Sequence, residues 1–146
     1  MPHDAPSPPD PSSLPARPIR FVHRDAIREV DGLPLHTTVL QWLREHAACM
    51  GTKEGCAEGD CGACTVILAE RAPESTGTSA PAGTAGAPAA ASGGVVLRTV
   101  NACIQFLPTL DGRALLTVED LRRIAGGALH PAQRALVDCH GSQCGF

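Results

Sequence analysis

Apolar and polar residues alternate in two short runs near the start of the chain. The runs are Ile19–Val22 and Ala26–Val30, and the polar group His23–Asp25 separates them. Alternation of this kind places one apolar face on a strand, and two such runs around a polar turn are typical of a hairpin. The pattern therefore predicts a β-hairpin over residues 19–30.

The next run changes from the strand period to the helical one. Starting at Leu40, apolar residues recur at i, i+3 and i+7, which gives one apolar stripe on a helix. Thr37 or Thr38 can cap its first turn, and Gly51 is expected to end it. Trp42, the only tryptophan, is interpreted as a packing residue of this helix.

Three further runs are rich in β-branched or apolar residues and predict strands at Thr65–Leu68, Val95–Val100 and Ala114–Val118. Between the first two lies Arg71–Gly94, which consists almost entirely of Ala, Gly, Pro, Ser and Thr. We interpret it as a long hairpin connection, because the entropy of closing a loop grows slowly with its length. About four strands with one helix packed across them predict an α+β fold.

Composition divides the chain further. Seven of the 13 prolines fall in the first 18 residues, so 1–18 is expected to be a disordered leader and 71–94 a disordered insertion. Residues 19–121 then form one domain of ordinary size. Residues 122–146 read as a linker followed by a short helix from Pro131, which is expected to be the start of an incomplete second domain.

Charge and hydropathy exclude some classes of function. A formal net charge of −3, without a basic stripe interleaved with aromatics, gives no case for nucleic-acid binding. The sequence has no apolar run of transmembrane length and no apolar segment typical of a secretory signal. We therefore expect a cytoplasmic protein without a membrane partner. In a reducing compartment, seven cysteines favour metal or cluster binding over disulfides.

Four cysteines carry the strongest signal for chemistry. Cys56, Cys61 and Cys64 follow a C-x4-C-x2-C spacing, and Cys103 comes after 38 further residues. This is the plant-type arrangement for a [2Fe–2S] cluster held by four thiolates. Four glycines among residues 51–62 suit a backbone that wraps closely around such a cluster. A structural zinc site usually shows two C-x2-C pairs, and only one is present, so zinc and free thiols are the less favoured alternatives.

The other charged and cysteine side chains of this region receive simpler interpretations. Cys49 is expected to be a small buried apolar residue. Glu58 and Asp60 are expected to be solvent-facing charges beside the predicted ligands. Cys139 and Cys144 repeat the x4 spacing, but on spacing alone they do not make a second metal site within this chain.

Longer segments resemble a known family, the molybdenum hydroxylases of the xanthine dehydrogenase type, in their iron–sulfur part. The sequence of Asn101–Asp111 is most similar to the small subunit of bacterial xanthine dehydrogenases. The small subunits of aldehyde oxidase and carbon monoxide dehydrogenase are near relatives. The segments that carry the resemblance are Gly51–Cys56, Gly59–Thr65, Val100–Cys103, Thr117–Glu119, Leu129–Pro131 and His140–Phe146.

The resemblance implies a β-grasp, ferredoxin-like domain in which Cys56, Cys61, Cys64 and Cys103 bind a [2Fe–2S] cluster. It also implies that Cys144 is the first ligand of a second [2Fe–2S] cluster in an all-α domain, of which this chain would hold only the first helix. By the same resemblance, Gln143 lies near the molybdopterin of a partner large subunit, and an FAD domain commonly follows. On this basis the chain looks truncated after Phe146.

The expected function is therefore electron transfer. In the family that the chain resembles, electrons released by purine hydroxylation at molybdenum pass through two [2Fe–2S] clusters to FAD and then to NAD. No residue is assigned as a catalytic base or nucleophile, so no turnover is expected from this chain alone. A free-standing [2Fe–2S] ferredoxin, acting as a soluble carrier, is the alternative.

Overall fold

The computed structural model describes residues 17–72, 90–91 and 94–141. Most of the predicted leader and insertion, together with Gln143 and Cys144, lies outside these residues. The strands and helices, in chain order, are β1 (Ile19–His23), β2 (Ala26–Val30), α1 (Val39–Gln41), η2 (Trp42–His46), β3 (Thr65–Arg71), β4 (Ala90–Ala91), β5 (Val95–Asn101), η3 (Leu107–Leu110), β6 (Ala114–Leu116), α2 (Val118–Ile124) and α3 (Pro131–Asp138).

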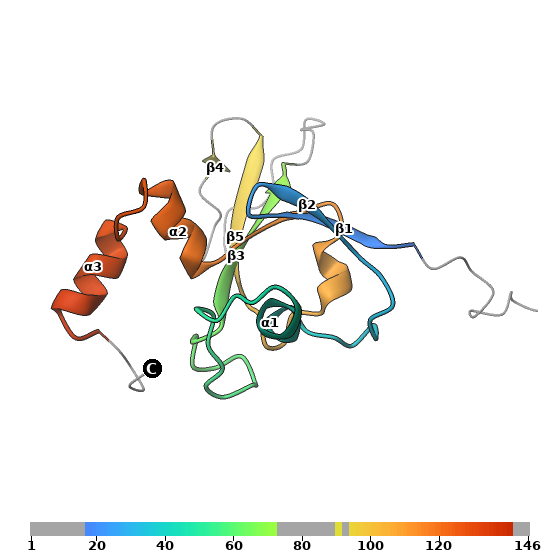
Figure 1. Cartoon of the computed structure of the whole chain (residues 1–146), viewed down its shortest axis with the longest axis horizontal. Coiled ribbons are helices and arrows are strands. Elements are labelled where there is room, and N and C mark those ends of the chain that lie inside the picture. Colours follow the sequence, from blue (N-terminus) through green and yellow to red (C-terminus); the bar gives the residue numbers. More distant parts are fainter. Residues whose placement is uncertain (1–16, 73–89, 92–93, 142–146) are drawn as a thin grey trace, which may run out of the picture.

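The strands form one mixed sheet in the order β2-β1-β6-β3-β5-β4 (Figure 1). β1 and β6 pair in parallel, and the other pairs are antiparallel. β1 and β6, the first and the last strands along the chain, thus lie side by side in the middle of the sheet. In the view of Figure 1, α1 lies below them. This arrangement confirms the predicted α+β class and is that of a β-grasp domain.

The predicted hairpin at the start of the chain is confirmed, and its turn is tight. His23 pairs with Ala26, so only Arg24 and Asp25 form the connection. Both have positive φ, +53° and +60° respectively. Two consecutive left-handed residues are typical of a type I′ turn, whose twist matches that of the flanking strands.

The strands that lead to and from the low-complexity segment are longer than predicted. β3 extends to Arg71 and β5 to Asn101, and they pair along their whole length, from Thr65 with Asn101 to Arg71 with Val95. Conversely, β6 ends at Leu116, because Thr117 caps the next helix through a reciprocal bond with Asp120.

The predicted helix after Thr38 begins where expected and ends earlier than expected. Thr38 caps α1 through a capping box with Gln41. The chain then widens into the π-turn η2, in which the Ala47 N–H donates to the Trp42 carbonyl at 3.0 Å. Ala48 follows with φ +51° and closes the helix. The expectation that Gly51 ends the helix was therefore wrong.

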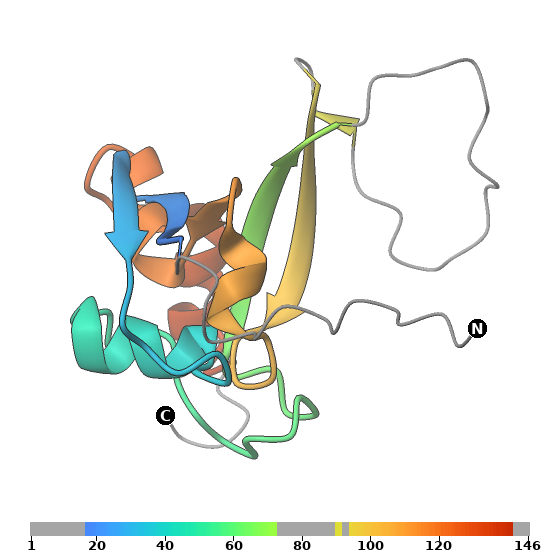
Figure 2. The same ribbon diagram turned by 90° about the vertical axis from the view of Figure 1, so that its right-hand side faces the viewer.

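One hydrophobic core lies between the sheet and the helical segments α1, η2 and η3, which cover the same face (Figure 2). Trp42 is only 5% exposed, and its ring meets that of Phe21 edge to face at a centroid distance of 4.9 Å. Its predicted packing role is confirmed. Further fully buried side chains are Val39, Leu43, Val66, Leu107, Leu110 and Leu115.

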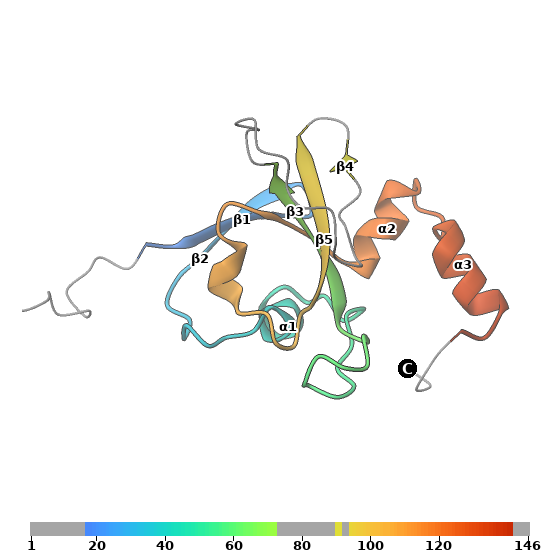
Figure 3. The ribbon, with the colours of Figure 1, turned by 180° about the vertical axis from the view of Figure 1, so that it is seen from behind.

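Helices α2 and α3 follow one another outward from the sheet (Figures 1 and 3). Gly126 and Gly127, both at positive φ, separate them. α2 spans residue 121, where the sequence predicts a domain boundary, and that boundary stays a prediction. No helix among the described residues is long and apolar enough to cross a membrane.

Candidate metal centre

The cysteine-rich loop lies at one end of the β3–β5 hairpin, opposite the end where the hairpin continues into the low-complexity segment (Figure 2). Cys64 immediately precedes β3, and Cys103 follows β5 by two residues. The pairing of Thr65 with Asn101 brings these two positions together. The Ala102 N–H closes the arrangement by donating to the Cys64 carbonyl at 3.1 Å.

Cys64 and Cys103 form the first pair of thiols. Burial raises the pKa of Cys103 to about 11, and a hydrogen bond with the Cys64 thiol acts in the same direction. The nearby Cys56 thiol adds to this, while the Gly59 N–H opposes it. The hydrogen bond thus joins Cys64 and Cys103, and the effect of the Cys56 thiol shows that a third predicted ligand lies near them.

Cys56 and Cys61 form the second pair. The N–H groups of Asp60 and Cys61 donate to the Cys56 sulfur at 3.3 and 3.4 Å. Together with the Glu58 N–H and the Cys61 thiol, they lower the pKa of Cys56 to about 7. Amide groups that point at a sulfur stabilise its thiolate, the form that binds metal. As predicted, the side chains of Glu58 and Asp60 themselves face solvent.

Two glycines make room for this arrangement. A β-carbon at position 55 would lie 2.7 Å from the Cys61 sulfur, closer than any ordinary contact. Gly59 has φ +84°, and its carbonyl accepts a hydrogen bond from Asn101 Nδ2. The loop is therefore a close-fitting cradle, held at its tip by residues that flank Cys103.

The four thiols are arranged as two pairs. Among the described residues, no group of three or more His, Cys, Asp and Glu side chains surrounds the position of a single metal ion. A [2Fe–2S] cluster takes its four thiolates on two irons. The donor set, the loop amides and the glycine cradle all fit such a cluster. They fit a tetrahedral zinc site less well, because that site needs four ligands around one ion.

Two other cysteines lie apart from these pairs. Cys49 is fully buried, as predicted, and burial raises its pKa. Its sulfur lies 3.4 Å from Nε2 of His23, whose other ring nitrogen is 3.3 Å from the Leu115 carbonyl. Cys139 is exposed at the end of α3. Cys144 and Gln143 lie outside the described residues, so their proposed roles stay predictions.

Sequence reasoning missed several residues that support the loop. Asn101 and Glu119 were noticed only as parts of longer motifs, yet each side chain bonds the backbone of the cysteine loop. Arg44 of η2 donates to the Thr52 carbonyl at 3.0 Å. For Asn101 and Glu119, the available signal was their place in the segments that resemble the hydroxylases, and not their spacing.

Comparison with known proteins agrees with this geometry. Residues 25–105 match the 2Fe-2S iron-sulfur cluster binding domain, more than half of the chain. The chain belongs to this family. The predicted [2Fe–2S] cofactor is thereby confirmed, and the chain is a 2Fe–2S electron-transfer domain.

This 2Fe–2S domain is related to the iron–sulfur region of xanthine dehydrogenases. It is 38% identical over 128 residues to xanthine dehydrogenase 1 of Arabidopsis thaliana, and 36% identical over 126 residues to the xanthine dehydrogenase/oxidase of Gallus gallus. Each alignment covers 86% of the chain and 8% of the relative. The xanthine dehydrogenase of Blastobotrys adeninivorans is 38% identical over 75% of the chain, which corresponds to 6% of that relative.

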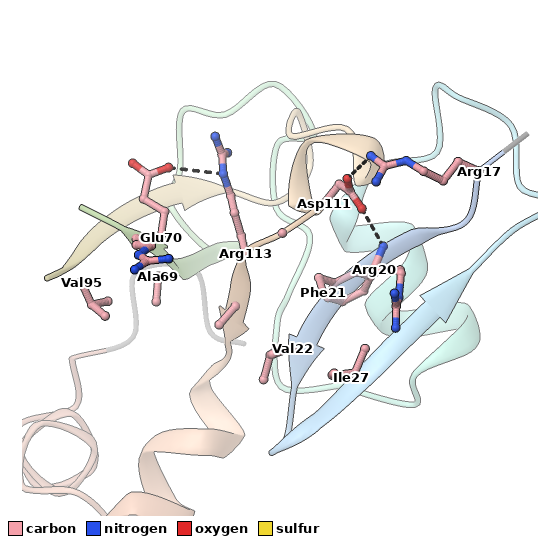
Figure 4. A pocket seen from close by; sticks show the side chains of 13 residues that line it. Arg17, Arg20, Phe21, Val22, Ile27, Ala69, Glu70, Val95, Asp111 and Arg113 are labelled. Atoms are coloured by element: carbon pink, nitrogen blue, oxygen red, sulfur yellow. Dashed lines mark hydrogen bonds and ion pairs between the residues drawn. The ribbon is translucent and has the colours of Figure 1, made fainter. Parts of the chain in front are cut away.

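A groove of about 540 Å³ lies elsewhere on the 2Fe–2S domain (Figure 4). One apolar residue from each of four neighbouring strands lines it in register, namely Ile27, Val22, Ala114 and Ala69. It extends to Arg71 and Val95, at the end of the β3–β5 hairpin away from the cysteine loop. The groove is therefore not part of the candidate metal centre.

Proposed function

We propose that the chain is the electron-relaying iron–sulfur module of a xanthine dehydrogenase-type hydroxylase, with Cys56, Cys61, Cys64 and Cys103 as the ligands of its [2Fe–2S] cluster. It would take electrons from a molybdopterin centre on a partner subunit and pass them toward FAD and NAD. A cytoplasmic location belongs to the same proposal.

The observation that carries this proposal is the extent of the similarity. The alignments with xanthine dehydrogenases cover 86% of the chain, more than the segment 25–105 that matches the iron–sulfur domain itself. A free-standing ferredoxin carrier needs only that segment. Similarity beyond it favours a module built into a larger hydroxylase, and such an assembly also accounts for the small share of each relative that the chain covers.

The cysteine loop supplies what an electron relay requires of the protein. When bound, a [2Fe–2S] cluster takes up and releases one electron at a time. Cys56 and Cys61 would hold one iron, and Cys64 and Cys103 the other. The amides of Asp60 and Cys61 point at the Cys56 sulfur and offset negative charge there. Cys64 is 2% exposed, whereas the other three cysteines are half-buried, so the metal centre lies near the surface and within reach of a partner.

The relay is tested by co-expressing the chain with the molybdopterin-binding and FAD-binding subunits of its hydroxylase. Under anaerobic conditions, xanthine should reduce the cluster of the assembled complex, seen as a [2Fe–2S] EPR signal. The same chain without the partner subunits should stay oxidised. If the partners do not associate with the chain, and the chain instead exchanges electrons with a ferredoxin reductase, the carrier function replaces this proposal.

A further inference from the structure

Glu119 joins the entry of the cysteine loop to helix α2. It lies in the first turn of α2, and its Oε1 accepts a hydrogen bond from the Gly51 N–H at 2.7 Å, across 68 positions of sequence. The backbone at Gly51 also packs closely against the first turn of α2. A β-carbon on residue 51 would lie 2.7 Å from Oε1 and 2.6 Å from Val118 Cγ1.

The same short segment is held from two further directions. The guanidinium of Arg44 donates to the Thr52 carbonyl at 3.0 Å, and the Lys53 N–H donates to the Ala63 carbonyl at 3.1 Å. Three consecutive residues are thus fixed by three different parts of the chain before the loop reaches Cys56. Only the bond to Gly51 comes from the helices that follow the sheet.

Glu119 is suited to this task because it is ionised. Burial alone would raise its pKa, but hydrogen bonds to the carboxylate, among them that from the Gly51 N–H, outweigh that effect, and the pKa is lowered. The positive charge of Arg24, on the β1–β2 turn, acts in the same direction. A hydrogen bond from an amide to a carboxylate is stronger than one to a neutral acceptor.

Helix α2 is itself fixed on its other sides. Arg123 forms an ion pair with Asp25 of the β1–β2 turn. Gln133 of α3 donates through Nε2 to the Val118 carbonyl at 2.9 Å. Glu119 therefore lies where the cysteine loop, the hairpin turn and the two outer helices meet.

We propose that Glu119 is a positioning residue of the metal centre: through Gly51 it fixes the entry of the cysteine loop, so that the placement of α2 and α3 bears on how firmly the loop holds its cluster. This inference rests on the proposed function for the presence of the cluster. It adds a residue outside the loop, on the first of the two helices that follow the sheet.

The test compares Glu119→Ala with Glu119→Gln in the full chain. Alanine removes the acceptor and leaves a partly buried N–H without a partner, whereas glutamine keeps an oxygen in the same place. We expect roughly tenfold faster loss of the cluster to a chelator in E119A. E119Q should stay within about threefold of the wild type, because a neutral acceptor retains part of the bond. Glu45→Ala, which removes an exposed carboxylate of η2, should match the wild type.

Hydrogen exchange of the Gly51 amide gives a readout that needs no cluster. The amide should be protected in the wild-type chain and in E119Q, and should exchange at least tenfold faster in E119A. Equal exchange in all three, or E119Q losing its cluster as fast as E119A, would overturn the role of Glu119. A wild-type chain that takes up zinc and no sulfide would instead overturn the proposed function, and the exchange measurement would still decide the inference.

Discussion

Replacing Gly55 with alanine adds a single carbon at the tightest point of the proposed metal centre. That carbon would lie 2.7 Å from the Cys61 sulfur and 3.6 Å from the Ala63 β-carbon. Ordinary contacts between such atoms are about 3.5–4.0 Å, so the sulfur or the loop must move by roughly 1 Å. Overpacking of this kind costs about 1–3 kcal/mol, which corresponds to a roughly 5- to 150-fold change in an equilibrium.

The assay reconstitutes the wild type and Gly55→Ala anaerobically and follows iron and acid-labile sulfide per chain, then their loss to a chelator. We expect Gly55→Ala to lose its cluster at least about tenfold faster, because metal–ligand distances in an intact site stay within about 0.2 Å of their usual values. Gly141→Ala is the matched control. Its added carbon also comes within 2.7 Å of another atom, but that atom is the mobile end of Leu136.

Gly141→Ala should behave as the wild type does. If Gly55→Ala loads and keeps its cluster equally well, the Cys61 sulfur does not occupy the position described for it, and the close contact with Gly55 has no part in holding the metal centre. That outcome would refute the reasoning from backbone fit to cluster retention.

Three further predictions concern the fold and the metal-free loop. Burial lowers the pKa of His23 below 6.5, so the unfolded chain binds this proton more readily. The free energy of unfolding, measured in urea, should therefore fall as the pH drops below about 6.5. A free energy of unfolding that increases as the pH is lowered from 7 to 5 would contradict this. Leu43→Ala should cost about 2–5 kcal/mol in the same assay, because the side chain is fully buried. Leu35→Ala, at an 80% exposed position, should cost less than about 0.5 kcal/mol, and equal effects would argue against the described core. In the metal-free chain at pH 7, iodoacetamide should modify Cys56, whose pKa is about 7, well before Cys103, whose pKa is about 11; mass spectrometry that found the reverse order would contradict the amide contacts.

Local patterns were enough to predict the parts of the fold that depend on neighbouring residues. The alternation in 19–30 identified the hairpin, and the β-branched runs identified the strands on both sides of the low-complexity segment. The cysteine spacing identified the loop, and the β3–β5 register then brought Cys64 and Cys103 together as the hairpin required. Each of these signals lies within a few residues of the feature that it predicts.

The features that were missed depend on contacts between distant parts of the chain. The helical period gave no sign that η2 would widen into a π-turn, or that the buried Cys49 would lie beside His23, 26 positions away. The same holds for the bond from Asn101 to Gly59, across 42 positions, and for the bond from Glu119 to Gly51. Periodicity reports which face of an element is buried, but it does not report which partner the polar groups meet.

The most direct test of the account is the metal content of the full chain and of its cysteine variants. After anaerobic reconstitution, the wild type should hold two irons and two acid-labile sulfides per chain and give a rhombic [2Fe–2S] EPR signal on one-electron reduction. Serine at position 56, 61, 64 or 103 should lower or abolish this content, whereas Cys139→Ser, at an exposed position outside the loop, should leave it unchanged. One zinc per chain without sulfide, or full iron and sulfide content in all four loop variants, would contradict the assignment.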